Sequence, residues 1–169
     1  EVNFDAMFEG YTSGRYDMLC APLFITPARA RASDFTERFF YLPYYLYARE
    51  EDHRFDNAYS KANVSDITYA SLDGDMNAIL GAEEFPNTVM FSIGQNASPT
   101  DAMIALIARK ADIATLEPVA AQAFMKANPG KIRQVDGPPV RVSSVGYSLP
   151  IGEEKFKSML NIGIQGMFD

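Results

Sequence analysis

The chain has 169 residues, of which 47% are hydrophobic and 22% are charged, and this composition is typical of a globular protein. The net charge of −7 argues against nucleic acid and anionic membranes as partners, because both require clustered lysine and arginine side chains. The only histidine, His53, excludes His-rich zinc sites, and the only cysteine, Cys20, excludes an internal disulfide.

The N-terminal part of the chain predicts a helix, a buried strand and a second, short helix. Apolar residues at helical spacing predict the first helix over residues 4–11. A nearly continuous apolar run predicts a buried strand over residues 16–25, with Cys20 as an inert, buried thiol. Thr26 stands where a helix N-cap would lie before Pro27, so a short helix is expected to begin at Pro27.

The rest of the chain alternates strands with helices. Residues 39–49 are rich in aromatics around Pro43, which favours an extended hinge strand. Further strands are predicted at residues 67–70, 88–93, 113–116 and 140–149, and helices at residues 76–85, 99–109, 119–127 and 153–168. This alternation is typical of mostly parallel sheets covered by helices, so the expected fold class is α/β.

Several short motifs follow one another at a characteristic spacing. They are Ser13-Gly14-Arg15-Tyr16-Asp17, Ile25-Thr26-Pro27-Ala28-Arg29, Asp34-Phe35-Thr36, Pro43-Tyr44-Tyr45, Asp73-Gly74-Asp75 and Lys110-Ala111-Asp112-Ile113-Ala114. In this order, and followed by the strand at residues 140–149, they make the chain resemble family 3 of the bacterial extracellular solute-binding proteins. The resemblance covers nearly the whole chain.

The resemblance implies a fold like that of the type II periplasmic binding proteins, in which hinge strands join two αβα lobes. Residues 1–47 and 146–169 are expected to form lobe one, and residues 48–145 to form lobe two. Because family members usually begin with a further strand, helix and strand, lobe one is expected to be incomplete, as in a truncated or trimmed chain. The strand at residues 16–25 would then have an unpaired edge, which predicts a homodimer through lobe one.

The resemblance also implies a set of candidate ligand-binding residues. Arg29 matches an arginine that holds a solute carboxylate, for which a guanidinium offers two parallel donors. Glu117 matches an acidic residue that holds a solute ammonium group, and the two are expected to face one cleft from opposite lobes. The alternatives are that Arg29 caps a surface helix and that Glu117 only suits the positive end of a helix. The candidate set is Pro22, Phe24, Thr26, Arg29, Gly74, Asp75 and Glu117.

Two candidates depart from the family pattern. Phe24 stands where many members have a hydroxyl residue, so a hydrogen bond is exchanged for an apolar wall. Asp75 stands where the ligand turn usually has a neutral hydroxyl, which favours a solute with cationic character or a differently arranged anionic group. Alternatively, Asp75 only caps the following helix. Arg29 is expected to be exposed and therefore to contribute little to stability.

These features predict a periplasmic solute-binding receptor of an ABC importer, binding an amino acid or a related small polar solute. Its expected partners are that solute and the membrane subunits of the transporter, and no signal peptide is recognised at the N-terminus. We expect no catalytic residue, metal or cofactor. The alternatives are an enzyme similar to periplasmic cyclohexadienyl dehydratases, with Glu117 or Asp75 as its acid, and a ligand-sensing domain of a membrane receptor.

Overall fold

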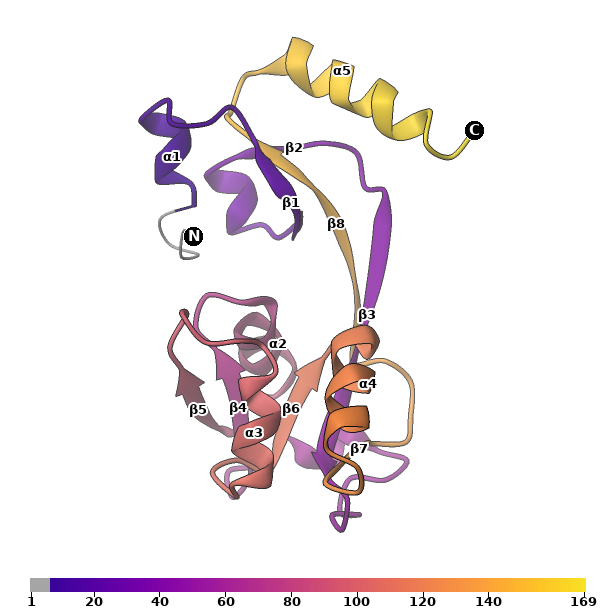
Figure 1. The fold of residues 1–169 in the computed structure, drawn as a ribbon. Helices are drawn as coiled ribbons and strands as arrows, with labels where there is room; N and C mark the ends of the chain where they lie inside the picture. Colours follow the sequence, from indigo (N-terminus) through magenta and orange to yellow (C-terminus); the bar gives the residue numbers. More distant parts are fainter. Residues whose placement is uncertain (1–6) are drawn as a thin grey trace. The chain divides into compact units, whose positions relative to one another are not determined.

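The computed structural model describes residues 7–169, which fold into two compact units (Figure 1). The described part of unit 1 is residues 7–42 and Ser143–Asp169, and unit 2 contains Pro43–Val142. The chain passes from unit 1 to unit 2 within β3 (Phe40–Arg49) and returns within β8 (Arg141–Leu149). Within the described residues, no helix is both long enough and apolar enough to cross a membrane.

Unit 1 is built around the C-terminal part of β8. The other elements of this unit are α1 (Glu9–Thr12), β1 (Leu19–Phe24), a 3-10 turn η1 (Arg29–Arg31), β2 (Asp34–Phe35) and α5 (Glu154–Gln165). Both β1 and β2 pair antiparallel with β8, at Leu19↔Ser148 and Phe35↔Ser148. The loop after β2 holds α5, because the Glu37 backbone N–H donates to Oδ1 of Asn161 over 2.8 Å.

The N-terminal elements are shorter than the sequence predicts. The helix expected over residues 4–11 begins outside the described residues, and its described part is α1, at Glu9–Thr12. The strand expected over residues 16–25 is β1, but the prediction that it is buried, with Cys20 as a buried thiol, is wrong. The register of β1 against β8 shifts between Leu19 and Leu23, and Cys20 and its two successors in this irregular stretch are exposed.

Unit 2 contains a sheet in the order β3-β6-β4-β5, with β7 (Ile132–Gln134) also paired to β3. The strands β4 (Thr68–Leu72), β5 (Val89–Ile93) and β6 (Ile113–Leu116) are parallel, and β3 runs antiparallel to β6 and β7. The connecting helices are α2 (Met76–Glu84), α3 (Asp101–Ile107) and α4 (Pro118–Ala127), and a 3-10 turn η2 spans Tyr59–Ala62. The predicted alternation of strands and helices is thus confirmed here.

Helices cover both faces of this sheet. On one face, Tyr47, Ala70 and Ala114 of the strands pack against Met103 and Leu106 of α3 and residues of α4. On the other face, the strand side chains pack against Phe85, at the end of α2, and the segment around η2. Figure 1 shows α3 and α4 in front of the strands and α2 behind them. Unit 2 is therefore an αβα sandwich in which alternate strand residues enter opposite cores.

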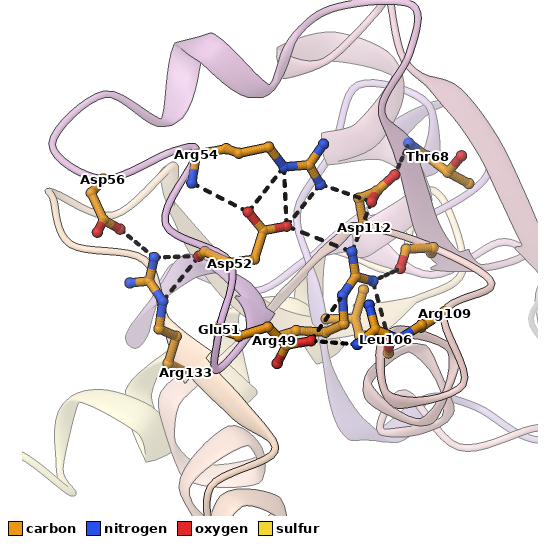
Figure 2. A network of polar contacts seen from close by, with 11 residues as sticks. Arg49, Glu51, Asp52, Arg54, Asp56, Thr68, Leu106, Arg109, Asp112 and Arg133 are labelled. Carbon is orange, nitrogen blue, oxygen red and sulfur yellow. Dashed lines mark hydrogen bonds and ion pairs between the residues drawn. The ribbon is translucent and has the colours of Figure 1, made fainter.

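Arginine and aspartate side chains form a cluster at the edge of the sheet where β4 and β6 begin (Figure 2). We call Arg49, Asp52, Arg54 and Asp112 the Arg–Asp cluster. Asp112 Oδ1 accepts from Arg49 Nη2 over 2.9 Å and from Arg54 Nη2 over 2.8 Å. Its Oδ2 accepts from the Thr68 backbone N–H over 3.0 Å, so one carboxylate connects three segments of unit 2.

The Arg–Asp cluster makes unit 2 sensitive to acid. The hydrogen bond from Arg54 holds the pKa of Asp52 below its ordinary value. Burial by itself raises the pKa of Asp112, but hydrogen bonds from Thr68, Arg49 and Arg54 outweigh burial, and the net pKa is lowered. For a carboxyl with a depressed folded-state pKa, the stabilisation is full above the unfolded pKa of about 3.9 and is lost as the pH falls through the folded value.

We therefore expect the free energy of unfolding to fall steeply below about pH 4. Urea unfolding followed by circular dichroism at a series of pH values measures this loss. The double variant Asp52→Asn with Asp112→Asn is less stable at neutral pH, and its stability depends less on pH over the acid range. If the free energies of unfolding of the native chain and the double variant change with pH in parallel, Asp52 and Asp112 are not the source of the acid sensitivity.

Candidate functional site

The candidate site in unit 2 lies where β4 and β6 end. These parallel strands are adjacent, with Ala70 opposite Ala114, so their carboxyl ends meet at the same edge of the sheet. Each end leads into a helix N-terminus, of α2 after β4 and of α4 after β6. The helices that follow the two strands cover opposite faces of the sheet, because Ala121 of α4 packs in one core and Phe85, at the end of α2, packs in the other. In open α/β sheets, ligands bind at such a topological switch point.

The turn after β4 contains two of the predicted residues. Gly74 has φ of +75°, a conformation that favours glycine, and it lets the chain reverse directly into α2. Asp75 is buried and caps α2, accepting from the Met76 backbone N–H over 2.7 Å. Its other oxygen accepts from Nδ2 of Asn77 over 3.0 Å. The predicted turn and the capping role of Asp75 are confirmed, and a contact of Asp75 with solute stays a prediction.

Glu117 follows β6 and caps α4. Its two carboxylate oxygens accept from the backbone N–H groups of Val119 and Ala120, each over 2.7 Å. Burial raises the pKa of the neighbouring Tyr47 hydroxyl, and the negative charge of Glu117 raises it further. A carboxylate offers about four lone-pair sites, so two capping bonds are compatible with a further contact to an ammonium group. The helix-end role is observed, and the solute contact remains a prediction.

A buried polar network that the sequence analysis missed supports this turn. The Tyr69 hydroxyl donates to the Asn77 carbonyl over 2.9 Å and also hydrogen-bonds the Thr115 hydroxyl. The Thr115 hydroxyl in turn lies 3.2 Å from Oδ1 of Asn77. Asn77 therefore links Asp75 to β6. The sequence signals were weak: a single threonine within the apolar run of β6, and an asparagine in the first turn of α2.

The remaining candidates lie together in unit 1, at the corner between β1 and η1. Thr26 is buried, and its Oγ1 accepts from the Arg29 backbone N–H over 3.2 Å, although only one 3-10 turn follows. The guanidinium of Arg29 donates through Nη1 to the Phe24 carbonyl over 3.2 Å. The expectation that Arg29 is exposed is wrong, since the residue is only 9% exposed. Pro22 lies in the exposed, irregular stretch of β1.

The two groups of candidates come from different units. Pro22, Phe24, Thr26 and Arg29 belong to unit 1, whereas Gly74, Asp75 and Glu117 belong to unit 2. His53 is exposed, and its Nδ1 lies within hydrogen-bond distance of Asp56 Oδ2, at 2.8 Å. The expectation that Arg29 and Glu117 face one cleft stays a prediction.

Several solved structures share this fold. A putative binding component of an ABC transporter from Wolinella succinogenes, complexed with lysine, superimposes with a TM-score of 0.84 at 16% identity, covering 97% of this chain and 69% of the other. Holo ArgBP from T. maritima has a TM-score of 0.81 at 17% identity, covering 100% and 71%. An ancestral amino acid-binding protein, a precursor of cyclohexadienyl dehydratase, has a TM-score of 0.81 at 16% identity, covering 98% and 68%.

These likenesses establish the fold, which is that of the type II periplasmic binding proteins. None of the curated protein sequences matches the chain. The sequence model that describes the bacterial extracellular solute-binding proteins of family 3 matches residues 1–169. The resemblance inferred from the motifs is thereby confirmed, and the chain belongs to the bacterial extracellular solute-binding proteins, family 3.

Proposed function

We propose that the protein is a periplasmic receptor of an ABC importer and that it binds an amino acid or a related small polar solute. The observation that carries this proposal is the switch point of unit 2, where the Asp73-Gly74-Asp75 turn and Glu117 follow adjacent parallel strands. Membership of a solute-binding family supports the same role. Its partners would be the solute and the membrane subunits of the transporter.

The charges of the candidate residues favour a solute that carries an ammonium group. Asp75 and Glu117 place two carboxylates on helix N-termini at one edge of unit 2. An ammonium group matches their charge, whereas a solute carboxylate needs a donor such as the Arg29 guanidinium of unit 1. The structural neighbours that are complexed with lysine and bound to arginine fit this preference.

In the proposed mechanism, units 1 and 2 act as the two lobes, and β3 and β8 act as hinge strands. A solute that contacts both lobes is bound fully only in the closed form, so it shifts the population towards closure. A thermal-shift screen with amino acids, polyamines and small carboxylates tests the proposal. A solute present at 100 times its Kd adds about 2.7 kcal/mol to stability and raises the unfolding midpoint. If none of these classes raises the midpoint, the proposal fails.

In the proposed complex, the Arg29 guanidinium pairs with the solute carboxylate. Replacing Arg29 with methionine is therefore expected to weaken solute binding by roughly 30-fold or more, because truncating one partner of a buried charge pair costs about 2–5 kcal/mol. Methionine keeps much of the buried volume, so folding is retained better than with alanine. Isothermal titration with a solute identified in the screen measures the affinity.

Arg31→Met is the matched control, since Arg31 lies in the same 3-10 turn and is exposed. We expect this variant to bind like the native chain. If Arg29→Met also binds with native affinity, Arg29 is not part of the site.

A second candidate function is that of a dehydratase. It is favoured by the structural likeness to a precursor of cyclohexadienyl dehydratase and by two carboxylates at the switch point. Glu117 would then act as the acid. Turnover of prephenate or arogenate that is lost in Glu117→Gln would support the dehydratase. Binding of a solute without turnover would support the receptor.

A further inference from the structure

The sheet of unit 2 ends at β5, which has β4 on one side (Figure 1). The Val89 backbone N–H donates to the Ile67 carbonyl over 2.8 Å, and the Ile93 carbonyl accepts from the Asp73 N–H over 2.9 Å. Because backbone groups alternate along a strand, residues 89, 91 and 93 bond towards β4. Met90 and Ser92 then direct their N–H and C=O groups to the open side.

This edge lacks the features that usually protect an exposed strand. Natural edge strands carry charged residues or proline, and β5 reads Val-Met-Phe-Ser-Ile with neither. Val89 is 55% exposed, and Ile104 on the neighbouring α3 is 51% exposed. Among residues 7–169, the outward backbone groups of this edge have no partner, so the edge offers both these groups and apolar area to another strand.

A groove of about 340 Å³ runs beside β5, between this strand and α3. Phe91, Ile93 and Ile104 line its apolar part. Two opposite charges also line it: Asp101 is the first residue of α3, and Lys110 follows the end of that helix. Since α3 connects β5 back to the parallel β6, Asp101 lies towards the end of β5 and Lys110 towards its start.

We propose that the groove and the edge bind a second copy of the chain, by antiparallel pairing of β5 with itself around a two-fold axis at Phe91. In this register, Met90 of one copy and Ser92 of the other exchange both backbone hydrogen bonds, using the groups that face outwards. Phe91 then lies opposite its own copy in a non-hydrogen-bonded pair, where side chains are closest and aromatic pairs stabilise the sheet.

The charges of the groove favour a second copy over an unrelated peptide. A two-fold axis reverses the direction of the groove, so the Asp101 end of one copy meets the Lys110 end of the other. Within residues 7–169, the structure gives Lys110 no side-chain hydrogen bond or ion pair. Two such Lys–Asp contacts would form per dimer.

This interface lies on unit 2, and it is distinct from the dimer that the sequence predicts through lobe one.

Cross-linking tests the register directly. Phe91→Cys is made in a Cys20→Ser background, because Cys20 is exposed and could itself cross-link. Non-hydrogen-bonded pairs have Cα atoms about 4.5 Å apart, within the range of about 4.4–6.8 Å that a disulfide spans. We expect Phe91→Cys to form a covalent dimer under mild oxidation. The control is Val89→Cys in the same background. In the proposed register Val89 faces Ile93 of the second copy and not its own copy, so we expect Val89→Cys to form no covalent dimer.

Light scattering and sedimentation across a range of concentrations test the association without a cysteine. The native chain should dimerise, and Ser92→Pro should be monomeric, because proline removes an outward N–H and leaves the bonds to β4 in place. Lys110→Glu should weaken the dimer, and Lys110→Glu with Asp101→Lys should restore it. A native chain that is monomeric at all concentrations would overturn the proposal, as would equal cross-linking of Val89→Cys and Phe91→Cys.

Discussion

Replacing Asp112 with alanine is expected to lower the free energy of unfolding by about 3 kcal/mol. Asp112 holds Arg49, whose side chain is 11% exposed, and also holds Arg54 and the Thr68 backbone N–H. Breaking a buried ion pair costs about 3–5 kcal/mol, because the remaining charge is left poorly solvated. The lower end applies here, since Asp52 remains 3.6 Å from Arg49. Urea unfolding followed by circular dichroism measures the change.

The control for this experiment is Glu51→Gln, at the exposed rim of the same region. Glu51 pairs with Arg109 over 2.8 Å, but both side chains are largely exposed to solvent. Exposed ion pairs contribute little, so the unfolding midpoint of this variant should stay near that of the native chain. If Asp112→Ala is no less stable than Glu51→Gln, the Arg–Asp cluster does not stabilise unit 2 as described.

Replacing Asn77 with alanine is expected to cost about 2–4 kcal/mol, through lost hydrogen bonds and a buried cavity. The substitution leaves Asp75 and the Thr115 hydroxyl each with one partner fewer. Because Asp75 lies in the candidate solute-binding turn and caps α2, we also expect solute affinity to fall. Denaturation and isothermal titration measure the two effects.

Asn96→Ala provides the comparison, because Asn96 is an exposed asparagine in the loop after β5. We expect this variant to have the free energy of unfolding and the solute affinity of the native chain. Native stability in Asn77→Ala would show that the buried network is not required for the turn.

Much of unit 2 could be predicted from the sequence, because its signals are local. The strand predicted at residues 113–116 has the bounds of β6, and Asp75 and Glu117 cap α2 and α4, the roles that the sequence offered as alternatives to solute binding. Apolar runs, capping residues and turn glycines act within a few residues of chain, so one sequence is sufficient to recognise them.

The short elements could not be predicted in this way. The strands β2 and β7 and the turn η2 have only a few residues each, too few to show a period. Strands of this length exist because a neighbour supplies their hydrogen bonds, as β8 does for β2 and β3 does for β7. The identity of that neighbour is a property of the tertiary structure.

By itself, the sequence determined the α/β class and the family, since these depend on local patterns and ordered motifs. Only the tertiary structure decided which side chains are buried and what they contact. The apolar run around Cys20 was expected to be buried, but Cys20 and its two successors are exposed where the register of β1 against β8 shifts, while Arg29 is buried. Burial depends on what packs over a residue, and distant segments supply those partners.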